Sequence, residues 1–174
     1  MTWPLSLHDE LIGRIRTLSR PMIPLSTGCQ PDIREPLDVR AILFDMYGTL
    51  FMSGSGDIAS HDPQGDGTIM AEALQAAGVK TCSPRAAAYA AAQWRPAIEK
   101  ARSIMRQAGV DVPEIDLVTV WQDLLHEMMS RQMVEGPLDH DVLDRLAVEF
   151  ECRQNPVWPM PDCLRVLNEL RQRG

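Results

Sequence analysis

The stretch Ala41-Ile-Leu-Phe-Asp-Met-Tyr-Gly-Thr-Leu-Phe51 decides the expected fold. Its first four residues form a continuous apolar run, too short for an isolated helix and without the polar alternation of a half-buried strand. Such a run is typical of a parallel strand that is covered on both faces. Asp45 would then stand at the carboxyl end of the strand, where open α/β sheets bind their ligands. We therefore expect an α/β protein with a ligand site at Asp45.

The residues after Asp45 allow two interpretations. In the first, Gly48 lets the backbone turn sharply towards a ligand, the N–H groups of residues 46–48 cradle a phosphoryl or carboxylate group, and the Asp45 carboxylate attacks carbon or phosphorus to form an ester. In the second, Asp45 and the following Gly48-Thr49 make an ordinary turn, with the carboxylate capping the next loop. The residues alone leave both interpretations open.

The chain divides into four segments by pattern. Residues 1–36 combine a helix over 7–19 with an irregular arm rich in proline and glycine. Residues 37–66 hold the first core strand, the loop after Asp45 and a glycine-rich stretch that could form a flap. Residues 67–154 have helical periodicity throughout, which predicts an inserted domain of four or so helices without a strand. Residues 155–174 return to the core and end in an amphipathic helix over 162–173.

Two local features add predictions about the helices of these segments. Pro96 lies within the Ala-rich helical pattern of residues 84–108 and should kink or divide that helix. Gly174 follows the last amphipathic helix, at the point where an α/β protein would begin its next parallel strand. We therefore expect that the chain is truncated before the second core strand.

Residues 41–51 resemble motif I of the haloacid dehalogenase superfamily of hydrolases, an apolar strand that ends in Asp-x-(Asp or Tyr)-Gly-Thr-Leu. The phrases Arg95-Pro-Ala-Ile98, Gly109 to Asp123 and Asn155-Pro-Val-Trp-Pro-Met-Pro-Asp162 resemble the helical cap of that superfamily and its return to the core. The resemblance covers about residues 39–174. It implies a Rossmann-like core with an inserted α-helical cap.

The resemblance also implies roles for the residues around Asp45. Asp45 would be the nucleophile and Thr49 would orient its loop, while Asp45 and the carbonyl of Tyr47 would bind Mg²⁺ in the metal-using members. Gly48 would lie against the substrate. Independently of the resemblance, the guanidinium of Arg95 could clamp a substrate carboxylate or phosphate, although a surface role is the alternative.

Tyr47 divides the expected chemistry into two subclasses. Phosphatases of the superfamily usually carry a second Asp at this position as general acid and base, and a tyrosine with an ordinary pKa near 10 is a poor base at neutral pH. The triplet Asp-x-Tyr instead resembles the 2-haloacid dehalogenases, which displace halide from carbon without a metal. We therefore expect a small phosphorylated or 2-halo acid substrate, with Mg²⁺ if the protein is phosphatase-like and no cofactor if it is dehalogenase-like.

A second function class remains open because parts of the superfamily's machinery are not identifiable. The chain has no recognisable strand ending in Ser or Thr, no acidic motif downstream, and no lysines besides Lys80 and Lys100, both in expected cap helices. Without these groups most of the electrostatic stabilisation of the transition state is missing. The alternative is therefore a catalytically incomplete fragment or interaction module that keeps motif I and the cap.

The composition limits partners and compartment. Of the 174 residues 45% are apolar, enough for a sizeable core, and the net charge of −7 with a pI near 5.0 argues against nucleic acid or an anionic membrane as the main ligand. No signal peptide or apolar run of membrane-spanning length is present, and the four cysteines form no metal-binding or redox pair. We expect a cytoplasmic protein with free thiols and a small-molecule substrate, with oligomerisation possible.

Overall fold

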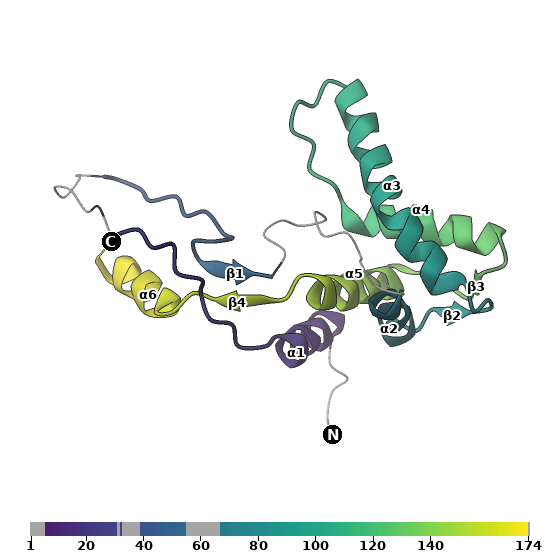
Figure 1. Ribbon diagram of the computed structural model, residues 1–174, viewed down its shortest axis with the longest axis horizontal. Helices are drawn as coiled ribbons and strands as arrows, with labels where there is room; N and C mark the ends of the chain where they lie inside the picture. The colour runs from purple at the N-terminus through teal and green to yellow at the C-terminus, as the bar shows by residue number, and fades with distance from the viewer. Residues whose placement is uncertain (1–5, 31, 33–38, 55–66, 174) are drawn as a thin grey trace.

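The computed structural model describes residues 6–30, 32, 39–54 and 67–173. This part of the chain forms a mixed α/β structure that is mostly helical, with elements along an elongated molecule (Figure 1). In chain order these are α1 (Leu7–Leu18), β1 (Phe51–Ser53), α2 (Thr68–Ala76), β2 (Lys80–Thr81), α3 (Ala86–Gln107), α4 (Leu117–Ser130), β3 (Val134–Glu135), α5 (His140–Gln154), β4 (Val157–Pro159) and α6 (Cys163–Arg173).

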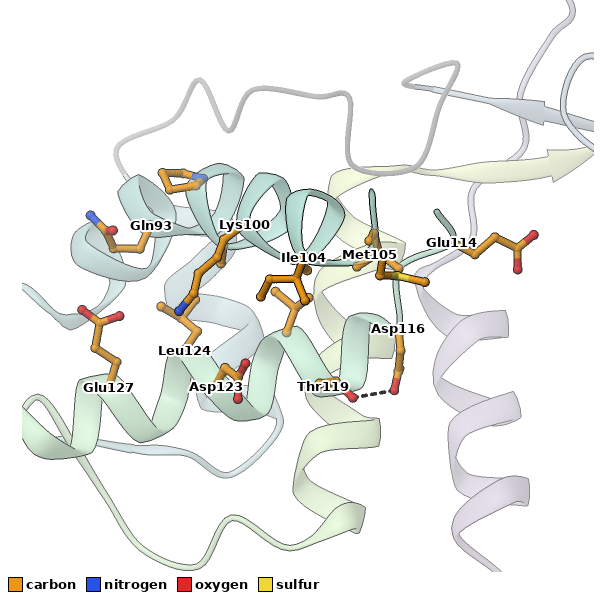
Figure 2. A pocket seen from close by; sticks show the side chains of 15 residues that line it. Gln93, Lys100, Ile104, Met105, Glu114, Asp116, Thr119, Asp123, Leu124 and Glu127 are labelled. Carbon is orange, nitrogen blue, oxygen red and sulfur yellow. Dashed lines mark hydrogen bonds between the residues drawn. The ribbon is translucent and has the colours of Figure 1, made fainter. Parts of the chain in front are cut away.

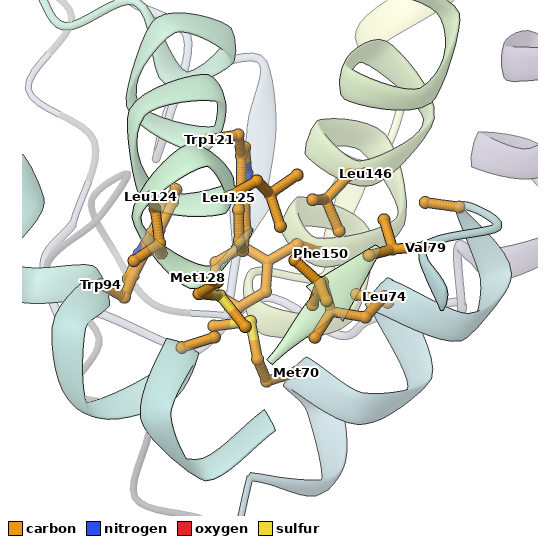
Figure 3. Packing of buried hydrophobic residues seen from close by; sticks show 14 of the residues in the cluster. Met70, Leu74, Val79, Trp94, Trp121, Leu124, Leu125, Met128, Leu146 and Phe150 are labelled. Carbon is orange, nitrogen blue, oxygen red and sulfur yellow. The ribbon is translucent and has the colours of Figure 1, made fainter. Parts of the chain in front are cut away.

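The helices α2, α3, α4 and α5 enclose the hydrophobic core (Figure 3). At its centre the ring of Trp94 stacks on that of Trp121 with centroids 4.3 Å apart, and Phe150 meets both rings edge-on. The largest fully buried side chains come from all of α2 to α5: Trp121, Phe150, Met70, Leu74, Ile98, Leu125, Met128, Leu143 and Leu146. This helical body therefore has a core of its own.

Local sequence signals account for where these helices begin and end. The side chains of Asp116 and Asp139 accept hydrogen bonds from the N–H groups of Val118 and Val142, which caps α4 and α5. Gly78 and Gly109 follow α2 and α3 with φ values of 84° and 89°, where glycine avoids the strain of other residues. The predicted helices over 7–19, 84–108 and 162–173 are confirmed within two residues at each end.

Two features of the helical segment differ from what the sequence predicts. α3 continues through Pro96 as a single helix of 22 residues, so Pro96 does not divide it, while the alternative of a kink stays a prediction. The segment is also not free of strands, because β2 and β3 pair antiparallel, with Lys80 opposite Glu135 and Thr81 opposite Val134. This pairing joins the segment after α2 to the segment after α4. Strands of only two residues leave almost no sequence pattern, so the pairing could not be predicted.

The expected parallel strand over residues 41–44 is not formed. β1 instead begins at Phe51 and pairs antiparallel with β4, with Met52 opposite Trp158. Residues 41–45 are extended and exposed, and among the described residues they make no backbone-to-backbone hydrogen bond. The physical reason is that a buried parallel strand needs neighbours on both sides, and the described part of the chain offers none.

The remaining helices flank this body. α1 lies against α5, and α6 follows β4 with Cys163 as its buried residue (Figure 1). All four cysteines are free thiols, as expected. Among the described residues, none of the helices combines the length and the apolar character needed to cross a membrane.

Candidate functional site

Asp45 lies at the entrance to a tight turn that precedes β1. The N–H groups of Leu50 and Phe51 both donate to the carbonyl of Met46, at 2.9 Å each, and the N–H of Gly48 donates to the carbonyl of Phe51 at 2.7 Å. Gly48 has a φ of 83°, a conformation that glycine adopts without strain. The turn therefore fixes the backbone that directly follows Asp45, and Asp45 itself is exposed to solvent.

The turn is joined to α5 and β4 by hydrogen bonds. The N–H of Met160 donates to the carbonyl of Leu50 at 2.9 Å. The hydroxyl of Ser53 donates to Oδ1 of Asn155 at 2.7 Å, and Nδ2 of Asn155 donates to Oε1 of Glu151 at 3.2 Å. Asn155 is buried, at 3% exposure, so this polar bridge between β1 and α5 is shielded from water.

Tyr47 lies half-buried beside this polar bridge. Burial raises the pKa of Tyr47 above its ordinary value, and the charge of Glu151 raises it further. Burial also raises the pKa of Glu151, while the hydrogen bond from Asn155 lowers it. Tyr47 is therefore an even poorer base at neutral pH than an exposed tyrosine, and its phenol stays protonated.

The expected anion cradle at residues 46–48 is only partly available. The N–H of Gly48 is already bound to the carbonyl of Phe51, so it cannot also point at a ligand without breaking the turn. Thr49 is exposed, within the same turn. Most of the expected flap falls in residues 55–66, outside the described residues.

Arg95 does not lie with these residues. Its side chain is exposed on α3, which belongs to the helical body, whereas Asp45 lies in the segment that leads into β1 (Figure 1). Arg95 and Asp45 thus lie on different parts of the described structure, and the role of Arg95 in binding a substrate stays a prediction. Lys80 is paired with Glu135 across the β2–β3 sheet, on the same side of the molecule as α3.

The side chains around Asp45 do not by themselves make a metal site. Within the described residues no three His, Cys, Asp or Glu side chains gather in a way that could hold a metal ion. One carboxylate and one carbonyl, those of Asp45 and Tyr47, would leave Mg²⁺ dependent on water and substrate for its remaining ligands. Mg²⁺ thus remains a prediction of the phosphatase-like interpretation.

Comparison with other proteins adds no relative. No family model, curated protein or solved structure matches the chain. The resemblance to the haloacid dehalogenase superfamily therefore rests on the residues quoted above, chiefly residues 41–51.

Sequence reasoning missed the polar bridge of Ser53, Asn155 and Glu151. Ser53 and Asn155 lie on opposite sides of the helical segment, and neither stands in a recognisable motif. One signal was available, because Asn155 directly follows a helix and precedes Pro156, a place where a polar side chain often caps or turns the chain. That signal indicates a turn but not the partner.

Proposed function

We propose that the protein is a hydrolase that acts through an ester on Asp45, with a small phosphorylated or 2-halo acid as substrate. The observation that carries the proposal is an exposed carboxylate directly before a tight turn, whose residues 46–51 are joined by three backbone hydrogen bonds. An exposed carboxylate can reach a substrate from solvent, and the turn fixes the backbone that follows it. The resemblance of residues 41–51 to motif I supports the same assignment.

On a 2-halo acid the reaction would proceed in two displacements. A carboxylate oxygen of Asp45 attacks the carbon that bears the halogen, the carbon–halogen bond breaks, and halide leaves with the electron pair. Water then attacks the side-chain carbonyl of the ester, which regenerates the Asp45 carboxylate, frees the 2-hydroxy acid and releases one proton to solvent. On a phosphate ester the same carboxylate would attack phosphorus, the bond from phosphorus to the leaving oxygen would break, and that oxygen would take up a proton from solvent. Water would then attack the phosphorus of the aspartyl phosphate, which releases inorganic phosphate and regenerates the Asp45 carboxylate.

Isotope transfer tests this mechanism directly. During one turnover of 2-chloropropionate in water labelled with heavy oxygen, attack on the ester carbonyl places solvent oxygen in the Asp45 side chain, and mass spectrometry of the peptide that contains Asp45 should detect it. With p-nitrophenyl phosphate water attacks the phosphorus of the aspartyl phosphate, so there borohydride added during turnover should reduce the acyl phosphate and convert Asp45 to homoserine. Label only in the 2-hydroxy acid, together with no borohydride-modified Asp45, would mean that water attacks the substrate itself and that Asp45 is not the nucleophile.

Two matched variants distinguish the loss of the nucleophile from the loss of a negative charge elsewhere in the protein. Asp45→Asn should abolish both activities, because an amide does not form the ester. Asp111→Asn removes an equally exposed carboxylate from the loop between α3 and α4 and should leave turnover unchanged. Parallel assays with and without Mg²⁺ divide the subclasses: metal-independent halide release indicates a dehalogenase, and metal-dependent phosphate release a phosphatase.

A second function is favoured by a different observation, the apolar surface of the segment that leads into Asp45. Leu43 is 98% exposed and Ile42 52% exposed, and the backbone around them has no pairing partner among the described residues. Exposed apolar segments with free backbone groups are templates for strand pairing between chains. We propose that, if the chain is an interaction module, residues 39–46 pair with the same segment of a second copy.

The oligomeric state tests this second function. Light scattering should show a dimer for the wild type and a monomer for Leu43→Lys, since a charge on the pairing segment opposes edge association. Leu25→Lys is the matched control, because Leu25 is 94% exposed in the N-terminal arm and should not affect association. A wild-type monomer at high concentration would contradict the interaction module.

A further inference from the structure

A groove of about 450 Å³ lies between α3 and α4, in the helical body and away from Asp45 (Figure 2). α3 forms one wall and α4 the other, and the loop that joins them closes one end. This volume is within the range of sites that hold small organic molecules, roughly 300–1,000 Å³. Because none of its lining residues belongs to the Asp45 turn, the groove is independent of the proposed hydrolase site.

Small side chains on α3 create the space. Ala97 and Ala101 stand one helical turn apart on the face of α3 that looks onto α4, and Leu124 lies opposite them. Ile104 also lines the groove and is 57% exposed, although it lies between two packed helices. The floor is therefore apolar surface that the protein leaves uncovered and that an apolar ligand would remove from water.

The rim of the groove is acidic. Four carboxylates and one ammonium line it, namely Glu114, Asp116, Asp123, Glu127 and Lys100. Figure 2 shows Lys100 reaching from α3 towards α4, between Glu127 and Asp123, with Glu114 at the opposite end. Such a rim attracts cations and repels anions.

The carboxylates differ in whether the protein already uses them. Asp116 caps α4 and also accepts a hydrogen bond from the hydroxyl of Thr119 at 2.7 Å. Glu127 accepts hydrogen bonds from Tyr89 and Arg131. Within the described part of the chain, neither Asp123 nor Glu114 has a hydrogen bond or an ion pair. Asp123 lies on α4 opposite α3, whereas Glu114 lies at the end of the groove, so Asp123 is the unpartnered carboxylate beside the apolar floor.

From this arrangement we propose that the groove binds a small organic cation, an amine or quaternary ammonium with an apolar body. The apolar body lies along Ala97, Ala101 and Ile104, and the positive group lies against Asp123. A bare metal ion does not fit, because no cluster of three possible ligands is present among the described residues and the floor is apolar. An anionic ligand does not fit either, since it would face the acidic rim.

Three probes with one apolar body and different charge test the proposal: 4-phenylbutylamine, 4-phenylbutan-1-ol and 4-phenylbutyrate. Backbone amide NMR titration of the whole chain should show that the amine binds most tightly, the alcohol weakly and the acid least. The shifted amides should lie on α3 and α4. Equal binding of the three probes, no binding of the amine at millimolar concentration, or shifts confined to other parts of the chain would overturn the proposal.

Substitutions with opposite expected signs make the test specific. Asp123→Asn should weaken binding of the amine by about fivefold, the size of one exposed ionic contact. Lys100→Gln should strengthen it by about two- to threefold, because it removes the cation of the rim. Asp111→Asn removes a nearby carboxylate that does not line the groove and should change little.

A bulky side chain placed in the groove gives a second test of binding. Ala101→Phe should abolish binding of the amine while the helical content stays that of the wild type by circular dichroism. If this variant fails to fold, the two charge variants still decide the question. A basic amphipathic peptide that binds the groove while the amine does not would assign the groove to a protein partner and overturn the small-cation assignment.

Discussion

Arg14 of α1 donates hydrogen bonds to both carboxylate oxygens of Glu149 on α5, with Nη2 3.0 Å from Oε2. Glu10 and Arg145 repeat this relationship one helical turn away with the charges exchanged, at 2.9 and 3.1 Å. The two forked pairs hold α1 parallel to α5. Because α1 has no fully buried side chain, these pairs carry much of its attachment to the helical body.

Removal of the Arg14 guanidinium should loosen α1 and destabilise the fold. Arg14→Met keeps an apolar stem but leaves Glu149, which is 3% exposed, with Arg153 as its remaining cation. The free energy of unfolding should fall by about 1–3 kcal/mol, as for other hydrogen bonds to charged groups. Urea unfolding measures the change. Arg145→Met removes the pair with Glu10, which is more exposed than Glu149, and should cost less; equal losses would contradict the view that the burial of Glu149 makes its pair with Arg14 the stronger anchor.

Glu149 should stabilise the fold in a way that depends on pH. Burial raises the pKa of Glu149, but hydrogen bonds from Arg14 and Arg153 outweigh it and hold the pKa below its ordinary value. The folded state therefore takes up this proton less readily than the unfolded state, so the stabilisation is present above the ordinary pKa of about 4.3 and is lost as the pH falls through the lowered value. Glu149→Gln should lower stability at pH 7, and urea unfolding at decreasing pH should show the two proteins converging.

Glu151 should show the opposite dependence. Burial raises its pKa, so the folded state takes up the proton more readily than the unfolded state, and the stabilisation present below the ordinary pKa is lost as the pH rises through the raised value. Glu151→Gln removes the charge but keeps an oxygen that can accept from Asn155. The variant should be more stable than the wild type at pH 8 and no more stable at pH 4. A variant that is less stable at pH 8 would contradict the pKa assignment.

The contrast between helices and strands explains how much of the fold the sequence predicts. Helix signals are local: the apolar spacing of α1 and α6 and the Ala-rich pattern of residues 84–108 each span only a few turns, so α1, α3 and α6 are predicted closely. Strand pairing is not local. β1 pairs with residues on the far side of the whole helical segment, and the apolar run 41–44, which has the stronger strand pattern, finds no partner within the part of the chain that the structure describes.

The candidate site divides in the same way. Asp45, Gly48 and their turn are adjacent in the sequence, so a motif can indicate them, and the positive φ of Gly48 agrees with the sharp turn expected there. Arg95 is a candidate only because its guanidinium could bind a substrate carboxylate or phosphate. No sequence pattern places Arg95 near Asp45 in space. The Ser53–Asn155 hydrogen bond joins residues that are brought together by the β1–β4 pairing, so it becomes visible only in the fold.

Gly54 should be essential to that pairing. Its N–H donates to the carbonyl of Pro156 at 2.9 Å, and a Cβ at this position would lie 2.7 Å from Cγ and 3.0 Å from Cδ of the Pro156 ring. A proline ring cannot swing aside as a flexible side chain does, so the backbones of β1 and β4 would have to separate. We therefore expect Gly54→Ala to lower the free energy of unfolding by about 1–3 kcal/mol, as other overpacked substitutions do.

Gly13 supplies the matched control for Gly54, because a Cβ there meets nothing within 4 Å and the residue lies inside α1. Gly13→Ala should raise the free energy of unfolding by about 0.5–1 kcal/mol, since alanine favours the helix. Urea unfolding should show a lower free energy of unfolding for Gly54→Ala and a higher one for Gly13→Ala. A neutral Gly54→Ala would mean that β1 and β4 do not approach as closely as the structure places them, and the attachment of the Asp45 turn to α5 would need another explanation.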